Sequence, residues 1–198
     1  MGVWARFFSL YYLFNAEYIC VFDDDTIPQK RWLENCVTTI KKHNALLGTI
    51  GIAFKKGNKY LAEFKYGWES LLIDNKNLIK KTNYVDIVGH SWFFKKEWIT
   101  QLIKELPNIR EEMFVCGEDM HLSYVLQKYL YIPTMVPPHP LEDKELWGSR
   151  PEKSKYYGNV NSTYAKFSGD GRFQKALSKY IDRGYETIMN RFNSIKIW

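Results

Sequence analysis

The sequence lacks several features that would assign it to a common protein class at once. It has only three cysteines in 198 residues, no zinc-ligand spacing, no phosphate-binding P-loop and no internal repeat. No apolar run approaches the ~20 residues that a membrane-spanning helix needs. These absences argue against a disulfide-stapled secreted domain, a zinc-finger protein, a P-loop enzyme and an integral membrane protein.

The cysteines indicate a reducing setting. Cys20, Cys36 and Cys116 are odd in number and widely spaced, and Cys20 and Cys116 lie in apolar stretches. Such cysteines are typical of buried free thiols. Residues 1–14 lack the basic leader and the small-residue cleavage site of a secretory signal. We therefore expect a cytoplasmic protein, and we leave open a peripheral position on the inner face of a membrane.

Positive charge and aromatic side chains are abundant. Lys and Arg number 28 against 22 acids, which gives a net charge of +6, and aromatics make up 17% of the chain. The excess charge suits a nucleic acid, an anionic membrane surface or a phosphorylated substrate. No arginine-rich run or nucleic-acid-binding motif is present, so we expect no nucleic-acid partner. The aromatic load predicts a large core or a site that stacks on flat ligands.

One stretch, Tyr18–Ile27, organises the rest of the chain. Apolar or aromatic residues from Tyr18 to Phe22 predict a strand buried on both faces, as in a parallel sheet. The strand ends in three acids, Asp23, Asp24 and Asp25, which repel one another unless a cation neutralises them. Hard oxygen ligands suit Mg²⁺ or Mn²⁺, which usually also coordinate substrate phosphates. The simpler alternative is a solvated acidic turn.

Two further groups of residues are candidates for chemistry. Glu118 and Asp119 open a predicted helix directly after Gly117, where a carboxylate is either a helix cap or a general base for a hydroxyl. His139 stands between prolines, and a neutral imidazole is a suitable ligand for Mn²⁺. His90 and His121 compete for that role, and any of the three histidines is structural in the alternative reading.

Strands and helices alternate along the chain, which predicts an α/β domain. We expect strands at 18–22, 46–54, 84–94 and 131–136, and helices at 3–14, 28–42, 95–106, 120–130 and 173–180. Residues 61–83 show no clear period and are expected to be irregular.

These features together resemble the nucleotide-sugar glycosyltransferases of the GT-A fold, family 2, over residues 3–149. The most specific parts are 20–32, 88–98 and 117–124. The glycosyltransferase domain of exostosin-like proteins is the second resemblance, because it also combines an acidic triplet with a late Glu-Asp pair. The resemblance implies a Rossmann-like, mostly parallel sheet with flanking helices. It also implies a core at 1–150 and a helical tail, packed on the core, at 151–198.

The resemblance implies a metal-dependent transfer of a sugar from a nucleotide-diphosphate donor to a glycan or other hydroxyl acceptor, with inversion. Asp23 and Asp25 match the ends of the Asp-x-Asp motif, which binds Mn²⁺ or Mg²⁺, and His139 matches a further ligand of some members. Asp119 matches the general base, and Glu118 would orient the acceptor. The resemblance further implies donor contacts at Asp24, Arg6, Trp147 and Arg150. Trp147 and Arg150 would lie in a flexible stretch that closes over the diphosphate. The implied acceptor contacts are Gly89, His90, Trp92 and Gly117.

The chain departs from the family at its start, because the acidic triplet arrives at residue 23, before the strands that hold the nucleobase in other members. A sheet without those strands exposes an edge and apolar faces. We therefore expect self-association or a second polypeptide that covers the missing N-terminal part. A silent glycosyltransferase remnant that binds a glycan or a partner is the alternative function, and a metal-dependent phosphotransferase or nuclease is a third.

Overall fold

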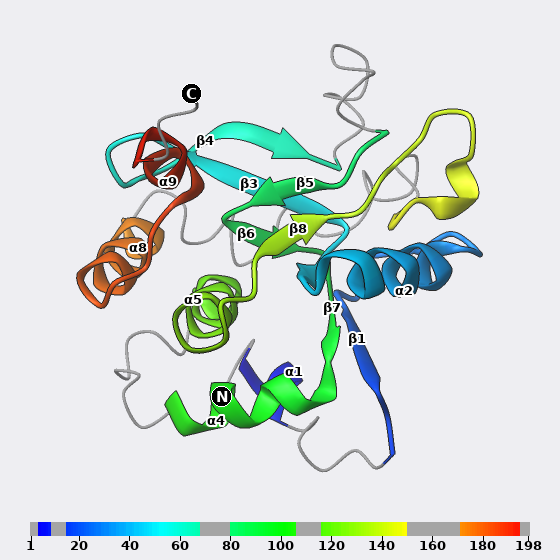
Figure 1. Ribbon diagram of the computed structural model, residues 1–198, viewed down its shortest axis with the longest axis horizontal. Coiled ribbons are helices and arrows are strands. Elements are labelled where there is room, and N and C mark those ends of the chain that lie inside the picture. The colour runs from blue at the N-terminus through cyan, green and yellow to red at the C-terminus, as the bar shows by residue number, and fades with distance from the viewer. Residues whose placement is uncertain (1–3, 9–14, 68–79, 106–115, 150–170, 195–198) are drawn as a thin grey trace.

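The computed structural model describes residues 4–8, 15–67, 80–105, 116–149 and 171–194 of the chain. These residues form a mixed α/β fold in which helices pack against two sheets (Figure 1). The first sheet has the strand order β1-β7-β2-β8-β5, and the second has the order β4-β3-β6. The strands are β1 (Tyr18–Phe22), β2 (Leu46–Leu47), β3 (Ile50–Lys55), β4 (Lys59–Tyr66), β5 (Asn83–Val85), β6 (Ile87–Gly89), β7 (Ser91–Lys95) and β8 (Thr134–Val136). The helices are α1 (Ala5–Phe8), α2 (Trp32–His43), α4 (Ile99–Glu105), α5 (Glu118–Leu130), α8 (Arg172–Asp182) and α9 (Ile188–Ser194), with short 3₁₀ turns η3 (Lys96–Trp98) and η6 (Lys144–Leu146).

The predicted strand at 18–22 forms as β1, but its neighbour runs in the opposite direction. The prediction that it is buried on both faces is wrong: β1 is at the edge of the described sheet, and of its five residues only Ile19 is buried. β1 pairs along its length with β7 in antiparallel register, from Tyr18 opposite Lys95 to Phe22 opposite Ser91. Among the described pairings of this sheet only β2 with β8 is parallel. The α/β class is confirmed, whereas the mostly parallel sheet is wrong. The reason is that a short apolar run predicts a covered strand and carries no information on the direction of its neighbour.

The predicted strands at 46–54 and 84–94 are each divided between the two sheets. A Cβ on Gly48 would lie 2.4 Å from the Cβ of Val88, so only a glycine allows this close crossing. The chain leaves the first sheet there and enters the second at β3. The prediction of an irregular segment at 61–83 is wrong up to Tyr66, because those residues belong to β4; residues 68–79 lie outside the described part.

Two apolar clusters form the core. The first lies between the first sheet and helices α2 and α4 and includes Trp32, Phe94 and Leu102. The second lies between the second sheet, α5 and α8 and includes Met120 and Tyr180. Helix α5 contributes to both clusters and packs against α4, α8 and β6 (Figure 1).

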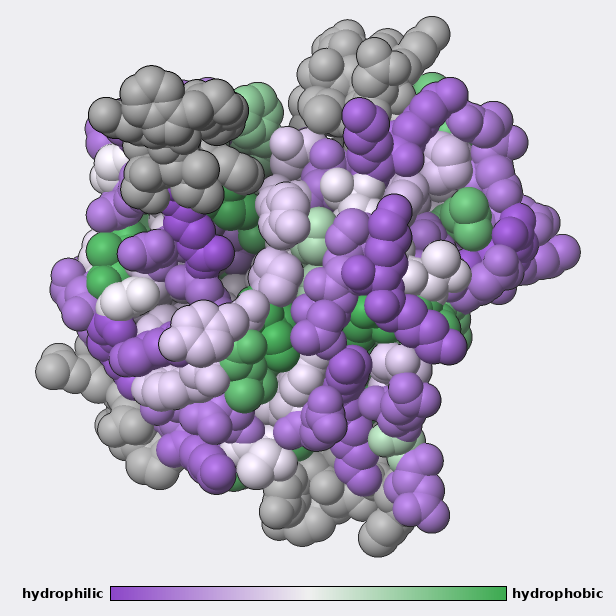
Figure 2. All heavy atoms as spheres, in the orientation of Figure 1, coloured by the Kyte–Doolittle hydropathy of each residue, from purple (hydrophilic) through white to green (hydrophobic). Residues whose placement is uncertain are grey.

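The ends of the chain pack onto this core where they are described. Helix α8 contacts α5 and β4, and α9 contacts β3. The expected boundary near residue 150 lies outside the described residues, so the division into 1–150 and 151–198 stays a prediction. Self-association or a second polypeptide also stays a prediction. Within the described segments, no helix combines the length and the apolar character needed to cross a membrane. Figure 2 shows one face on which hydrophilic residues surround small apolar areas.

Candidate active site at the end of β1

The register of β1 and β7 places two candidate turns beside each other. Phe22 pairs with Ser91 at the end of the ladder, and the backbone N–H of Asp23 donates to the carbonyl of His90 (3.0 Å). The acidic turn that begins at Asp23 is therefore adjacent to the Gly89–Trp92 segment. His90 has a φ of 60°, a left-handed conformation that side-chain-bearing residues rarely adopt and that is found more often at functional sites.

The three acids of the turn differ in their surroundings. Asp24 is exposed, whereas Asp23 and Asp25 are half-buried. Burial raises the pKa of Asp25, the charge of His90 opposes that rise, and the charges of Asp23 and Asp24 add to it. A cation beside Asp25 would counter this repulsion and stabilise the carboxylate form.

Arg6 of α1 contacts the acidic turn, although it lies 17 residues before Asp23 in the chain. Its guanidinium forms an ion pair with Oδ1 of Asp23. The same guanidinium lies over the ring of Trp92, 4.9 Å from the ring centroid, and Phe7 packs edge-on against Trp92 at 5.6 Å. Trp92 is 3% exposed. In this arrangement Trp92 contacts Arg6 and Phe7, and its contact with an acceptor stays a prediction.

The second acidic pair opens α5, as the sequence predicts. Gly117 is the N-cap, with a φ of 84°, and a Cβ there would lie 3.3 Å from the Cβ of Ala176 in α8. Glycine is required because of both this conformation and this close approach. Glu118 and Asp119 follow in the first helical turn, half-buried, where the helix dipole favours negative charge. The backbone N–H of Met120 donates to Oδ1 of Asp119 (2.7 Å).

Electrostatics connect this pair to the turn after β1. Burial raises the pKa of Glu118, and the charge of Asp119 adds to the rise. Burial also raises the pKa of Asp119, and hydrogen bonds from the backbone partly oppose it. For both groups the charge of Asp23 raises the pKa further and that of Arg6 lowers it. The two acidic groups of the sequence, far apart along the chain, therefore belong to one cluster with Arg6.

A comparison with known families covers one part of this cluster, the acidic turn after β1. Residues 13–103 match the model of glycosyl transferase family 2. This match, over a little less than half of the chain, supports a family 2-like glycosyltransferase domain. The match spans β1, the acidic turn and the Gly89–Trp92 segment, and the α/β fold is compatible with the GT-A architecture. A comparison with curated proteins found no match.

The acidic turn offers carboxylates but not a complete set of metal ligands. Among the described residues, no three His, Cys, Asp or Glu side chains lie close enough together to hold a metal ion. The acidic turn nonetheless supplies half-buried carboxylates of the hard type that Mg²⁺ and Mn²⁺ prefer. Such ions often bind through one or two carboxylates and complete their coordination with substrate phosphates and water. These carboxylates therefore suit a metal ion that is bound by the acidic turn and a diphosphate together.

His139 does not join this donor set. It is 2% exposed, its Nδ1 donates to the carbonyl of Pro137 (2.9 Å), and its Nε2 accepts the backbone N–H of Gly148 (3.2 Å). Both ring nitrogens therefore have backbone partners. Burial lowers the pKa of His139 to about 4, which keeps the ring neutral. In this structure His139 anchors a loop, and His121 is buried in the second cluster of the core beside Trp4, Tyr124 and Tyr180.

Trp147 belongs to the same loop and is not an open flap. It is 3% exposed, its Nε1 donates to the carbonyl of Pro140 (2.7 Å), and its own carbonyl accepts the N–H of Gln29 (3.1 Å). The expectation that Trp147 lies in a flexible stretch is wrong, since burial and these hydrogen bonds fix it beside the chain that follows the acidic turn. Arg150 lies outside the described residues.

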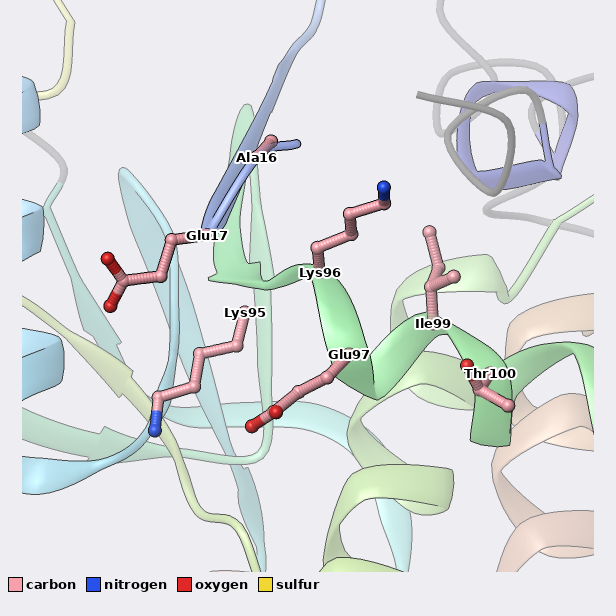
Figure 3. A pocket seen from close by; sticks show the side chains of 7 residues that line it. All are labelled: Ala16, Glu17, Lys95, Lys96, Glu97, Ile99 and Thr100. Carbon is pink, nitrogen blue, oxygen red and sulfur yellow. The ribbon is translucent and has the colours of Figure 1, made fainter. Parts of the chain in front are cut away.

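A cavity of about 440 Å³ lies at the opposite end of β1 from the acids (Figure 3). Glu17 and Ala16 precede β1 there, Lys95 is the last residue of β7, and Lys96 follows it. None of the candidate site residues lines it. Its volume therefore does not bear on the chemistry of the acidic cluster.

Sequence reasoning named Arg6 but missed its central position. Arg6 is the one charged residue in the apolar stretch 3–14, and that isolation was the available signal. Sequence reasoning also missed Thr49 and Ser91, whose hydroxyls hydrogen-bond to each other (2.7 Å) beneath the loop that carries Gly148. Single hydroxyl residues of this kind carry no distinguishing pattern in a sequence.

Proposed function

We propose that the chain transfers a sugar from a nucleotide-diphosphate donor to a hydroxyl acceptor, with inversion and with Mn²⁺ or Mg²⁺ as the cofactor. The observation that carries the proposal is the shared charge environment of Asp23, Glu118 and Asp119 around Arg6. A glycosyl transfer needs a site for the departing diphosphate next to a site for the attacking hydroxyl. The two acidic groups supply one each.

Asp119 is the proposed general base. A base is most effective when its pKa lies near the working pH, and the raised pKa of Asp119 brings it closer to that range. Because the pKa of Glu118 is raised as well, Glu118 is suited to hold a hydrogen bond to the acceptor while Asp119 takes the proton. Inversion is proposed because one base is sufficient and the cluster contains no separate nucleophile and acid pair.

The turn after β1 is the proposed donor end. Asp25, with Asp23 beside it, would hold the cation, which stabilises the negative charge of the departing diphosphate. Arg6 lies close enough to contribute positive charge at the same point, since it already contacts Asp23. His139 is left out of the proposed ligand set because both of its nitrogens bind the backbone.

Nucleoside-diphosphate release from a panel of uridine and guanosine diphosphate sugars tests the proposal. We expect release to require Mn²⁺ or Mg²⁺ and to fall about 10²-fold or more in Asp25→Asn, because charge stabilisation by a metal contributes several kcal/mol. Asp182→Asn is the matched control, since Asp182 is an exposed residue at the end of α8. Metal-independent release, or unchanged release in Asp25→Asn, contradicts the metal assignment.

Folding of the variant is expected to be preserved. Asn removes one of three adjacent like charges, so the metal-free protein loses the repulsion from Asp23 and Asp24 together with the attraction of His90. Thermal unfolding of Asp25→Asn without metal should therefore occur at the wild-type temperature or slightly above it. A large drop would assign Asp25 a structural role.

A further inference from the structure

Arg6 lies within the acidic cluster and is paired with one of its carboxylates. Its guanidinium pairs with Oδ1 of Asp23, and its charge lowers the pKa of both Glu118 and Asp119. The contact with the ring of Trp92 holds the guanidinium in place from one side, because an arginine stacks favourably on an aromatic face. A positive charge that is part of the chain therefore already offsets some of the negative charge of the acidic cluster.

This pairing conflicts with direct binding of a divalent cation to Asp23. The oxygen that contacts Arg6 cannot also bind a metal without bringing two positive charges close together. Like charges at such a short distance repel each other, and they do so more strongly near a protein surface than in bulk water. A diphosphate removes the conflict, because its own negative charges lie between the guanidinium and the metal.

We propose that Arg6 is a built-in counter-ion that competes with the divalent metal for Asp23, so that metal binds tightly only together with a nucleoside diphosphate. The inference rests on the proposed function, because it assumes a metal and diphosphate site at the acidic turn. It adds that Arg6 controls the metal affinity of that site. The domain would stay free of loosely bound metal until its donor arrives, and the donor and the metal would enter as a pair.

Calorimetric titration of Mn²⁺ into the full chain tests the proposal without any activity measurement. Arg6→Met removes the charge and keeps an unbranched apolar side chain against Trp92. We expect Arg6→Met to bind Mn²⁺ alone about tenfold more tightly than the wild type, in line with the charge interaction removed. With uridine or guanosine diphosphate present, the difference should shrink, so the gain in Mn²⁺ affinity caused by the nucleotide is smaller in the variant.

Two controls separate the local charge from other effects. Arg6→Lys keeps a positive charge and should bind Mn²⁺ alone within about twofold of the wild type. Lys41→Met changes the net charge of the protein equally, but Lys41 is an exposed residue at the end of α2, so it should leave Mn²⁺ affinity unchanged. If thermal unfolding shows that Arg6→Met does not fold, Arg6→Gln replaces it as the neutral variant.

The outcomes distinguish this inference from the proposed function. Equal Mn²⁺ affinity of the wild type and the neutral variant, with normal binding of Mn²⁺ and nucleotide together, overturns the counter-ion role and leaves the proposed function standing. Weaker Mn²⁺ binding in the neutral variant also overturns it. Absence of Mn²⁺ binding in every variant, with and without nucleotide, overturns both.

Discussion

The acidic cluster and the loop at residues 137–149 are two polar regions with opposite character. In the loop, several polar groups are paired with the backbone: His139 bridges Pro137 and Gly148, and the amide of Asn35 donates to the carbonyls of Pro138 and Leu146 (2.8 and 2.9 Å). In the cluster, carboxylates with raised pKa values gather around a single described guanidinium.

The difference separates a structural network from a candidate site. A buried network with satisfied hydrogen bonds stabilises one conformation. A concentration of like charges costs stability, and it persists at sites that bind a charged ligand. The comparison therefore predicts that substitutions in the acidic cluster change activity and leave stability nearly intact, whereas substitutions in the loop change stability first.

The largest expected effect is that of Asp119→Asn in the acidic cluster. We expect kcat to fall about 10²-fold or more, because a general base contributes to the transition state, while the apparent affinity for the donor stays the same. The melting temperature should hardly change, since an exchange of Asp for Asn at a helix start costs little. Steady-state kinetics with a nucleotide sugar and thermal unfolding measure the two. Normal turnover would reduce Asp119 to a residue that stabilises the helix start.

Gly148→Ala is the corresponding test in the loop, with a large effect on stability. A Cβ at Gly148 would lie 2.4 Å from Oγ1 of Thr49 and 2.7 Å from its Cγ2. We expect a loss of about 3 kcal/mol in the free energy of unfolding, since overpacking of this kind forces neighbours to move. Gly89→Ala is the matched control, because a Cβ there meets Ile50 only at 3.8 Å. Chemical denaturation measures the unfolding free energy of both variants. Equal stability would show that the loop shifts to make room for the added Cβ at little cost.

The pH dependence of stability isolates His139. Its folded-state pKa is lowered to about 4 from an ordinary value near 6.5, so the unfolded chain takes up a proton first as the pH falls. The stabilising contribution is complete above pH ~6.5 and is lost as the pH falls through about 4. Between pH 7 and 5 we expect a loss of about 2 kcal/mol from this residue.

His139→Gln measures that contribution by difference. Denaturant unfolding of the wild type and the variant at both pH values should show a weaker acid dependence in the variant. Asp86 acts in the opposite direction, because burial raises its pKa to about 6, and its contribution is common to both proteins. Equal slopes would mean that His139 takes up its proton as easily in the folded protein as in the unfolded chain.

Thr49→Val is the smallest expected effect. The Thr49 hydroxyl accepts from Ser91 (2.7 Å) and donates to the carbonyl of Gly148 (3.2 Å). Its loss should cost about 1 kcal/mol of unfolding free energy, the usual net value of a buried hydrogen bond. Thr38→Val on the exposed side of α2 serves as the control. If both substitutions have the same effect in chemical denaturation, the hydroxyl network contributes nothing measurable.

Sequence reasoning located elements better than it located their partners. The strand at 18–22 and the helix that opens at Glu118 were predicted with nearly the observed bounds, because apolar runs and a glycine before two acids are local signals. Helix α2 begins at Trp32, preceded by Arg31, and not at the predicted Pro28. The chain between them is held by hydrogen bonds to the loop at Glu145 and Trp147, which no local pattern announces.

By itself the sequence determined that a strand ends in three acids, that two more acids open a helix, and that one isolated arginine lies near the start. The tertiary structure decided that β1 lies against an antiparallel neighbour, that Arg6 pairs with Asp23, and that His139 binds the backbone of its own loop. The physical reason is range. Strand and helix formation depend mainly on neighbouring residues, whereas the partner of a charge or a ring nitrogen depends on which distant surfaces pack together.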